Sequence, residues 1–387
     1  MTIGFIGLGA MGSAALYQLA KRGIRVIGLD RFSPPHDQGS THGETRITRR
    51  AIGEGEAYVP LAVRSHEIWR ELEAETGVDL LHEIGSIIVS EADDNTARPG
   101  RTGFIQRTIK AARTYGIPHE ILGAEEVRHR HPNLLITDAE IAYFEPGGGY
   151  LRPEACVGAN LELARRLGAE LRLNTAVQTI APDGDGVRVS TSTGDFFAGK
   201  VVVSAGGWAS ELLGDRFRPL LQPVRQVMHW FPIDADAADI WARSPVFMWP
   251  HGDDADGFFY GFPSLPGANA MKTADEFYGA PSDPNAIDRE VPPADSTRMF
   301  DAHLKNRLGG ISSKAVRAVT CVYTVSPDSA FVIDWHQNNR NILVVSPCSG
   351  HGFKHSAAIG EAVAEKLVLG QSRIDLSAFS LDRFDGR

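Results

Sequence analysis

Two glycine-rich turns are the residues whose spacing most directly suggests chemistry. Gly7-Leu8-Gly9-Ala10-Met11-Gly12 follows the apolar run Ile3–Ile6, and Ser349-Gly350-His351-Gly352-Phe353-Lys354 follows the apolar run Ile342–Val345. Glycines between a strand and a helix let the backbone approach a flat or anionic ligand, and N–H groups at the start of the helix can bind phosphate. Because the two turns lie near opposite ends of the chain, we expect both ends to bind one ligand.

The first turn belongs to a unit that is typical of dinucleotide binding. Ser13–Arg22 predicts a helix and Arg25–Leu29 a second strand. Asp30 then stands about 20 residues after the turn, where such folds place the acid that accepts hydrogen bonds from a ribose. A third turn, Ala205-Gly206-Gly207-Trp208, follows the apolar strand Val201–Ser204 and is assigned to the same fold. A cofactor bound by both ends of the chain favours FAD over NAD.

Composition limits the other classes of function. The 387 residues suffice for two domains, and 43% hydrophobic with 22% charged residues is ordinary for a soluble protein. A net charge of −9 argues against a nucleic-acid partner. We expect no leader and no membrane span, and therefore a cytoplasmic protein. The cysteines are too scattered for a disulfide framework, and we assign no metal, since His129-Arg130-His131 reads as a surface loop.

The changes of character along the chain predict an α/β fold with a discontinuous cofactor domain. Helical spacing from Leu61 to Leu72 predicts a helix that Gly77 ends, and Ala357–Leu367 predicts another. Ser86–Ser90 reads as a strand, and the stretch from there to Phe144 is expected to mix short helices with loops. Residues 221–319 contain aromatic runs separated by Pro, Gly and Asp, which is typical of a loop-rich antiparallel sheet. We therefore predict a Rossmann-like FAD-binding domain from residues 1–85, 145–220 and 320–387. A mixed or antiparallel-sheet substrate domain, residues 86–144 and 221–319, is inserted in it.

A nicotinamide enzyme is the main alternative. The spelling Gly4-Phe5-Ile6-Gly7-Leu8-Gly9-Ala10-Met11-Gly12 by itself resembles the NAD(P)-dependent β-hydroxyacid dehydrogenases. Those enzymes continue into a largely helical second domain, which the aromatic, Pro/Gly-rich second half of this chain contradicts.

Six motifs in order resemble one family of flavoenzymes along nearly the whole chain, from about Ile3 to Phe384. They are His42-Gly43-Glu44-Thr45-Arg46-Ile47-Thr48-Arg49, Gly53-Glu54-Gly55, Tyr58-Val59-Pro60-Leu61, Tyr260-Gly261-Phe262-Pro263, Cys321-Val322-Tyr323-Thr324 and Ser349-Gly350-His351-Gly352-Phe353-Lys354. The family is that of monomeric sarcosine oxidase and N-methyltryptophan oxidase. The resemblance implies a two-domain FAD enzyme that oxidises a secondary amine, N-methyl or cyclic, of an amino acid. It also implies that O2 takes up the electrons and leaves as hydrogen peroxide, that the partners are a small amine and O2, and that the enzyme is a monomer.

The resemblance also implies roles for single residues. Cys321 matches the cysteine that joins the flavin 8α-methyl through a thioether, so FAD is expected to be covalent. Lys272 matches the lysine at which the family's reduced flavin reacts with O2, where a fixed ammonium would stabilise superoxide. Arg49 and Lys354 match the pair that binds the substrate carboxylate, as a planar fork and a point charge. Arg46 would lie over the flavin ring and stabilise its reduced, anionic form.

The remaining site residues follow from the same matching. Tyr260 and Tyr323 would line the substrate pocket, His42 would shape its loop, and His351 would support the turn. Cys156 and Cys348 are assigned to the core. The expected cofactor-binding residues are Gly7, Gly9, Met11, Gly12, Asp30, Arg31, Ser40, Thr41, Arg46, Val177, Ala205, Gly206, Trp208, Cys321, Gly350, Gly352, Phe353 and Lys354.

One position departs from the family pattern. After the oxygen lysine the family reads Lys-x-Gly-x-His, whereas this chain reads Lys272-Thr273-Ala274-Asp275-Glu276. A carboxylate there would disfavour a second carboxylate in the substrate and would suit a cationic or hydroxylated side chain. Related alternatives are an oxidase of cyclic or sugar-linked amines, a flavin amine dehydrogenase with another electron acceptor, and a flavin-binding module without catalysis.

Overall fold

A six-stranded sheet carries the predicted dinucleotide unit. The computed structural model describes residues 1–98, 100–276 and 278–385, so the predicted cofactor segment ends two residues beyond the described part. The sheet order is β19-β20-β13-β1-β2-β9, in which β19 alone runs antiparallel to its neighbour. The strands are β1 (Ile3–Ile6), β2 (Val26–Leu29), β9 (Glu170–Arg172), β13 (Lys200–Val203), β19 (Val332–His336) and β20 (Asn339–Ser346).

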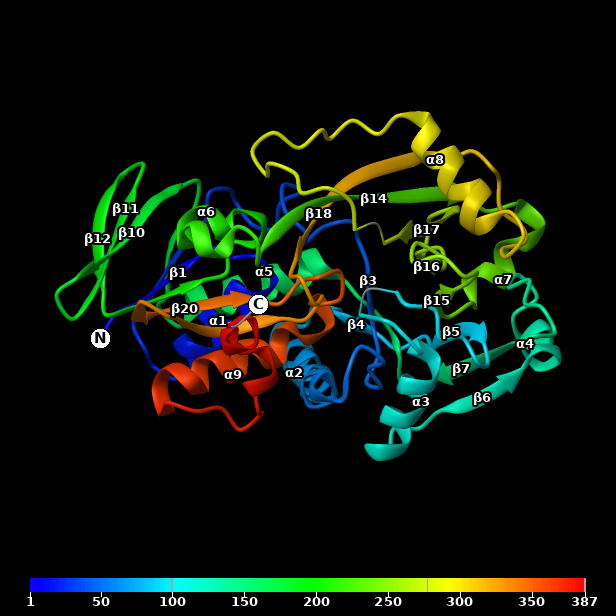
Figure 1. Ribbon diagram of the computed structural model, residues 1–387, viewed down its shortest axis with the longest axis horizontal. Coiled ribbons are helices and arrows are strands. Elements are labelled where there is room, and N and C mark those ends of the chain that lie inside the picture. Colours follow the sequence, from blue (N-terminus) through cyan, green and yellow to red (C-terminus); the bar gives the residue numbers. More distant parts are fainter. Residues whose placement is uncertain (99, 277, 386–387) are drawn as a thin grey trace.

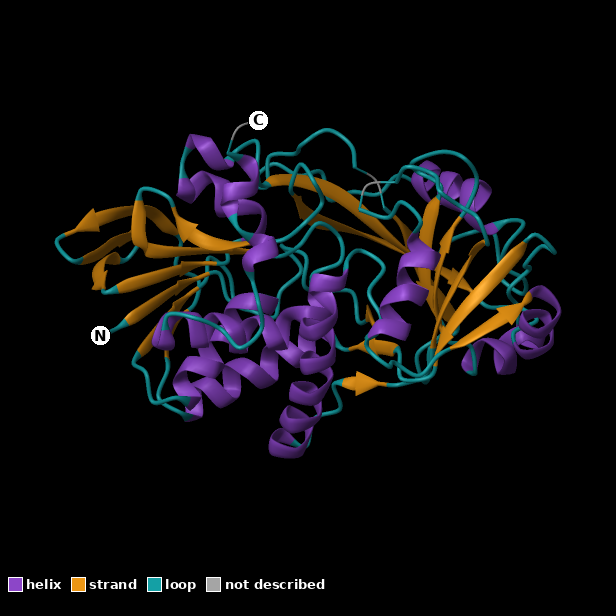
Figure 2. Ribbon diagram, turned by 60° about the horizontal axis from the view of Figure 1, so that its bottom comes forward, coloured by secondary structure: helices purple, strands orange, loops and turns teal. Residues whose placement is uncertain are grey.

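Alternating side chains of these strands pack against two different layers. Phe5, Val202 and Leu343 face helices, whereas Ile6 and Val203 face a smaller sheet. The helices are α1 (Ala10–Lys21), α2 (Val59–Thr76), α5 (Pro153–Arg166) and α9 (Ser356–Leu369), and the smaller sheet consists of β10 (Val177–Asp183), β11 (Gly186–Thr191) and β12 (Gly194–Ala198). Figure 2 shows the helices gathered on one side of this sheet. Both faces are therefore buried, as is usual for parallel strands.

Glycines allow two of these helices to end and to pack. Gly77 ends α2 with a left-handed φ of 70°, and Gly370 ends α9 with φ 79°. A Cβ on Gly360 of α9 would lie 2.6 Å from the carbonyl carbon of Ala14, so only glycine permits this approach to α1. The helices predicted around Ser13–Arg22, Leu61–Leu72 and Ala357–Leu367 are confirmed, with ends shifted by a few residues.

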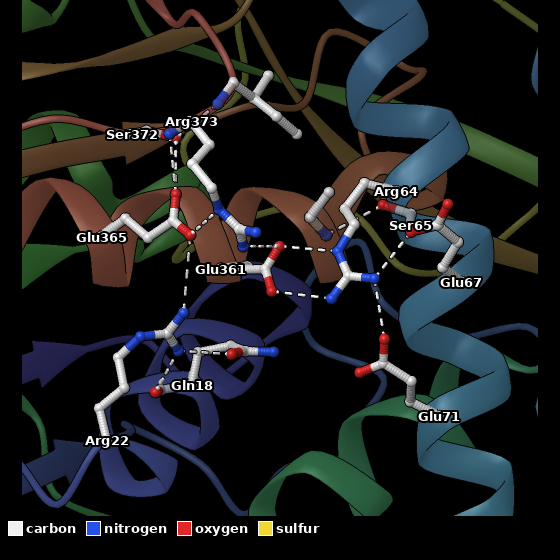
Figure 3. A network of polar contacts seen from close by, with 12 residues as sticks. Gln18, Arg22, Arg64, Ser65, Glu67, Glu71, Glu361, Glu365, Ser372 and Arg373 are labelled. Atoms are coloured by element: carbon white, nitrogen blue, oxygen red, sulfur yellow. Dashed lines mark hydrogen bonds and ion pairs between the residues drawn. The ribbon is translucent and has the colours of Figure 1, made fainter.

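A network of ion pairs joins three of these helices at the surface (Figure 3). Arg64 of α2 forms a two-pronged contact with Glu361 of α9 at 2.8 and 2.9 Å. Arg22, just after α1, approaches Glu365 of α9 at 3.9 Å, and Arg373 also binds Glu365. Because several charges share partners, the network fixes the helices more firmly than a single exposed pair would.

The second lobe is an eight-stranded sheet of order β18-β14-β17-β16-β15-β5-β7-β6, antiparallel except between β15 and β5. Its strands are β5 (Ser86–Glu91), β6 (Glu120–Gly123), β7 (Glu140–Glu145), β14 (Gln222–Pro232), β15 (Val246–Pro250), β16 (Phe258–Phe262), β17 (Ala270–Asp275) and β18 (Arg317–Val325). One face buries aromatic side chains such as Phe231, Phe247 and Phe259. The long strands β14 and β18 extend from this lobe toward the first one (Figure 1).

Short elements complete the fold. A small sheet of order β3-β8-β4 contains β3 (Arg46–Thr48), β4 (Leu81–His82) and β8 (Gly149–Leu151). The other α-helices of the described residues are α3 (Phe104–Thr114), α4 (Ala124–Arg130), α6 (Ala209–Leu213), α7 (Ala238–Ala242) and α8 (Pro293–Met299). None of the helices in the described chain combines the length and the apolar character needed to cross a membrane.

The order of strands bears on two expectations. The stretch up to Phe144 is expected to mix short helices with loops, and it does contain α3 and α4. The expectation is wrong for β6 and β7, which are strands of the eight-stranded sheet. The predicted domain boundary at residue 320 falls within β18, which pairs with β14 of the second lobe. The division into domains stays a prediction.

Candidate functional site

A cavity of about 440 Å³ opens at the carboxyl ends of the parallel strands. It begins at the turns after β1, β2, β13 and β20, the place where open α/β sheets bind ligands. Most predicted cofactor residues line it: Gly7, Gly9, Met11, Asp30, Arg31, Ser40, Thr41, Arg46, Val177, Ala205, Gly206, Trp208, Gly350, Gly352 and Phe353. Gly12, Cys321 and Lys354 do not.

The glycines of the first turn fit a closely held dinucleotide. Gly7 has φ 90°, and a Cβ there would lie 2.5 Å from the Ser204 carbonyl oxygen. A Cβ on Gly12 would lie 1.9 Å from the Gly7 carbonyl oxygen, so Gly12 closes the turn although it does not line the cavity. At Gly9 the nearest atom to a Cβ is Thr41 Oγ1 at 3.6 Å, so this glycine leaves space in front of the start of α1. That space can take a pyrophosphate.

Asp30, the predicted ribose acceptor, is fixed at the edge of the cavity by backbone hydrogen bonds. Its carboxylate accepts hydrogen bonds from the backbone N–H groups of Leu8 at 2.7 Å and Phe32 at 2.8 Å. Beside it, the guanidinium of Arg31 lies over the ring of Trp208, 5.7 Å from the centroid. These residues form one end of the cavity, and Arg46, Tyr323 and Cys348 line it as well.

Two thiols lie close to the cavity. Cys321, on β18, is buried, and its Sγ lies 3.9 Å from Arg46 Nη2; burial raises its pKa. Cys321 does not line the cavity itself, but its neighbours Val322 and Tyr323 do. Cys348 packs against a small apolar cluster but is only partly buried and also lines the cavity, so its assignment to the core is correct only in part. The reason is that Cys348 follows β20 in the turn that closes on the ligand site. Cys156 is buried in α5, as expected.

Lys272 and Arg46 form one cationic region of the site. Lys272 Nζ donates hydrogen bonds to Gly43 O at 2.6 Å, Thr45 O at 2.7 Å and Thr45 Oγ1 at 3.0 Å. It also lies 4.5 Å from the centre of the Phe262 ring. Arg46 Nη2 donates to Ser40 O at 2.6 Å. Burial lowers the pKa of Lys272 well below its usual value, and its three acceptors are uncharged oxygens that favour the ammonium.

Arg49 and Lys354 meet at one buried carboxylate. Arg49 Nη2 donates to Glu54 Oε2 at 2.7 Å, and Lys354 Nζ lies 3.6 Å from Glu54 Oε1. Lys354 Nζ also donates to His351 O at 2.8 Å. The surrounding cations hold the pKa of Glu54 well below its usual value although burial raises it. Glu54 was part of a matched motif, but sequence reasoning gave it no role.

Glu276 is not a free acid. It forms a two-pronged ion pair with Arg101, in which Arg101 Nη2 lies 2.8 Å from Glu276 Oε1. Tyr278 donates to the same carboxylate at 3.0 Å. Arg101 Nη2 also lies 3.9 Å from Glu54 Oε1, which links this pair to Arg49 and Lys354. Arg101 and Tyr278 were missed by sequence reasoning.

The remaining predicted residues are buried near these groups. The hydroxyls of Tyr260 and Tyr323 lie 3.2 Å apart. Burial, with Arg46 close by, lowers the pKa of His42 to about 3, so its ring is neutral near pH 7. Burial likewise lowers the pKa of His351 to about 3, and its Nε2 contacts Ser329 O at 3.0 Å. No cluster of three or more metal-binding side chains occurs in residues 1–98, 100–276 and 278–385.

A mostly parallel sheet with a glycine-lined cavity, joined to a larger mixed sheet, is typical of two-lobed proteins that bind a dinucleotide. The chain belongs to the family described as FAD dependent oxidoreductase, which it matches over residues 5–366. It is 36% identical over 381 residues to monomeric sarcosine oxidase of Bacillus sp. (strain B-0618), covering 98% of this chain and 95% of the relative. It is 37% identical over 384 residues to N-methyl-L-tryptophan oxidase of Yersinia pestis (strain Pestoides F), covering 98% of each. The predicted family is thereby confirmed.

Solved structures share the fold. NikD, an unusual amino acid oxidase essential for nikkomycin biosynthesis, aligns with TM-score 0.81 and 24% identity over 98% of this chain and 96% of that one. L-proline dehydrogenase from P. horikoshii aligns with TM-score 0.81 and 23% identity over 99% and 97%. The predicted α/β fold class is confirmed. A nicotinamide-dependent hydroxyacid dehydrogenase is excluded, since the second lobe is a large sheet and not a helical domain.

The cluster around Glu54 predicts anion binding that depends on pH. Burial lowers the pKa of Lys354 to about 7, with Glu54 opposing and Arg49 adding to the decrease. A carboxylate without an amine should therefore bind best below about pH 7, where Lys354 is protonated, and its Kd should rise up to about tenfold per pH unit above that value. The change in the flavin spectrum on titration measures this Kd.

The matched control is Lys354→Arg, because a guanidinium stays charged throughout this range. Its Kd for the same carboxylate should stay within about threefold from about pH 6 to about pH 9. An unchanged pH profile in this variant would assign the titration to another group.

Proposed function

We propose that this chain is a flavin-dependent oxidase of a secondary amino acid, N-methyl or cyclic, with O2 as electron acceptor and hydrogen peroxide as product. The curated relatives named above act on sarcosine and N-methyltryptophan by their names, and the family gives the cofactor, FAD. We further propose that it acts as a cytoplasmic monomer on a small-molecule substrate.

The observation that carries the substrate class is the charge of one buried cluster. With Lys354 protonated, Arg49, Arg101 and Lys354 supply three positive charges, and Glu54 and Glu276 supply two negative charges, all with side chains 6% exposed or less. One positive charge is left over, which matches one substrate carboxylate. Among the residues that the structure describes, Lys354 Nζ donates one hydrogen bond, to His351 O, so two of its N–H groups can bind that carboxylate.

The chain's own groups would orient the substrate and keep its amine neutral. Arg49 and Lys354 fix the carboxylate, so the α-amino group points toward the cavity end lined by Tyr323 and Gly350. Bound FAD would supply the acceptor for a hydride from the carbon next to the amine and the route by which the electrons reach O2. The positive charges nearby favour a deprotonated amine, whose lone pair is needed to form the imine. Holding the reacting atoms in position can supply about 7–11 kcal/mol of the barrier.

Two further roles are proposed within the same function. Cys321 would form a thioether with the flavin 8α-methyl group, replacing its S–H and one C–H in a two-electron oxidation whose electrons reach O2 through the flavin. Lys272 would stabilise superoxide, because its acceptors are neutral oxygens and leave its charge available to an arriving anion. A dehydrogenase with another electron acceptor has no specific support from this region.

An anaerobic titration tests the reaction itself. N-methyl and cyclic amino acids added without O2 should bleach the yellow flavin, and admitting air should restore the colour with about one peroxide per flavin. Amines that lack a carboxylate should reduce the flavin at least about tenfold more slowly at equal concentration. Bound flavin that no amino acid of this class bleaches would contradict the proposal and leave a module without catalysis.

The oxygen role is tested by Lys272→Met. Reoxidation of the reduced enzyme by O2 should slow about 100-fold, while reduction by amine should change little, because only the first involves a developing anion beside Lys272. Lys314→Met, which removes an exposed lysine, is the control and should alter neither rate. Equal slowing of both reactions by Lys272→Met would mean that Lys272 only holds the loop at Gly43–Thr45.

The covalent bond is tested with two thiols that lie near the same cavity. Acid precipitation of the wild type should leave flavin on the protein, whereas Cys321→Ala should release it. Cys348→Ala is the matched control and should retain it. Flavin released from the wild type, or from Cys348→Ala instead of Cys321→Ala, would overturn the assignment.

A further inference from the structure

Arg101 and Glu276 form a buried ion pair between two segments that are far apart in the sequence. Arg101 precedes α3 and Glu276 follows β17, and both residues are 5% exposed. Tyr278 closes the contact, with its hydroxyl 3.0 Å from Glu276 Oε2 and 3.3 Å from Arg101 Nη1. The Arg101 guanidinium lies 4.5 Å from the centre of the Phe258 ring, so the ion pair packs against an aromatic side chain.

The pair lies beside the proposed substrate position. A Cβ on Gly350, which lines the cofactor cavity, would lie 3.2 Å from Glu276 Oε1 and 2.9 Å from the ring of Tyr323. On its other side, Arg101 Nη2 is 3.9 Å from Glu54, the carboxylate shared by Arg49 and Lys354. A substrate bound through its carboxylate at Arg49 and Lys354 would therefore bring its side chain close to this pair.

A second observation points to a ligand in the same cluster. Arg49 Nε and Arg101 Nε are buried donors without a hydrogen-bond partner among the described residues. Buried donors are normally satisfied, and an unsatisfied donor costs about 1–3 kcal/mol. The cluster thus contains donors in excess as well as one positive charge in excess.

We propose that Arg101 and Glu276 are a charge-compensated specificity pair that selects amino acids with an uncharged side chain or N-substituent. This inference rests on the proposed function, whose substrate carboxylate takes up the one excess charge. Once that carboxylate is bound, the cluster is neutral, and a further buried charge on the substrate would have no counter-ion. Such a charge costs several kcal/mol when it leaves water. The cationic side chain expected from Glu276 alone is excluded, because Arg101 already neutralises that acid.

Removing one partner should convert the pair into a receptor for the opposite charge. Arg101→Gln leaves the Glu276 carboxylate without its cation, so a positively charged substituent can replace the guanidinium. Glu276→Gln leaves Arg101 without its anion, so a negatively charged substituent can replace the carboxylate. Truncating one member of a buried pair leaves the other charge without a partner, which is strongly unfavourable. Each variant should therefore prefer the ligand whose charge replaces the one that was removed.

The test uses three carboxylates of matched length and no reaction: pentanoate, glutarate and 5-aminopentanoate. Their Kd values are measured on the flavin-loaded enzyme by the change in flavin spectrum and by the shift in Tm. The wild type should bind pentanoate about tenfold or more tightly than either charged analogue. Arg101→Gln should bind 5-aminopentanoate more tightly than pentanoate, and Glu276→Gln should bind glutarate more tightly than pentanoate. The double variant should show the same order of affinities as the wild type.

A buried arginine of the same loop gives the control. Arg98 pairs with Asp94 at 2.6 Å and donates to Gly252 O at 2.6 Å, away from Glu54 and Glu276. Arg98→Gln should leave the order of the three ligands unchanged. If either glutamine variant loses flavin, Arg101→Lys and Glu276→Asp replace it, and these charge-preserving variants should keep the wild-type order.

The outcomes separate this inference from the proposed function. Wild-type enzyme that binds none of the three carboxylates would remove the carboxylate site, and with it the substrate class proposed above. Wild-type enzyme that binds pentanoate but shows no discrimination, or variants that weaken all three ligands equally, would show that the pair is structural and would overturn the inference alone.

Discussion

Buried charge must be compensated, and Glu54 is where this chain meets that requirement. Its side chain is 3% exposed and faces Arg49, Lys354 and Arg101 within 4 Å. An ion that leaves water without a partner costs several kcal/mol, so none of these cations is tolerable there alone. The three come from the segment after β3, from the turn after β20 and from the segment before α3. Forming the cluster therefore fixes both ends of the chain and the second lobe around one point.

The alternation of side chains along each strand decides which residues face the cluster around Glu54 and which face the apolar core. Phe259 and Met271 face the apolar core of the second lobe, whereas Tyr260 and Lys272 point the other way because alternate residues of a strand face opposite sides. The side chains of the site contact the segment from Ser40 to Glu54. Its backbone oxygens bind Lys272 and Arg46, and its last carboxylate binds Lys354. This segment thus lies between two cationic regions. Lys272 and Arg46 face neutral oxygens, whereas Arg49 and Lys354 face the carboxylate of Glu54.

Local signals were enough to predict most of the fold. The glycine turns, α2 with its stop at Gly77 and the apolar strand β13 follow from short-range rules, namely positive φ, helical period and runs of β-branched residues. Most of the cavity lining was predicted from the glycine turns and from the resemblance to the flavoenzyme family, whose motifs are continuous in the sequence. The strand β7 was missed because it spans only six residues and its buried positions, Glu140, Ala142, Tyr143 and Glu145, do not alternate strictly.

The charge of the site could not be predicted in the same way. Glu276 was recognised as a departure, but its partner Arg101 is 175 residues away in the sequence and stands among residues that read as an exposed loop. No local pattern marks such a pair, because what defines it is burial, and burial depends on how β17 and α3 pack. An unpaired acid would favour a cation in the substrate, whereas an acid that is already paired with Arg101 does not. Cys348 was misassigned in part for a similar reason, since a buried thiol and a cavity-lining thiol have the same sequence signature.

The two buried lysines show how compensation separates binding from transient stabilisation. Lys354 faces a carboxylate, so its charge is partly neutralised and a substrate carboxylate completes an arrangement that is stable at rest. Lys272 faces neutral oxygens, which orient the ammonium without cancelling its field. A field that no directly paired anion cancels acts most strongly on a charge that develops during a reaction. A lysine can therefore bind a stable carboxylate at one place, Lys354, and stabilise a short-lived anion at the other, Lys272.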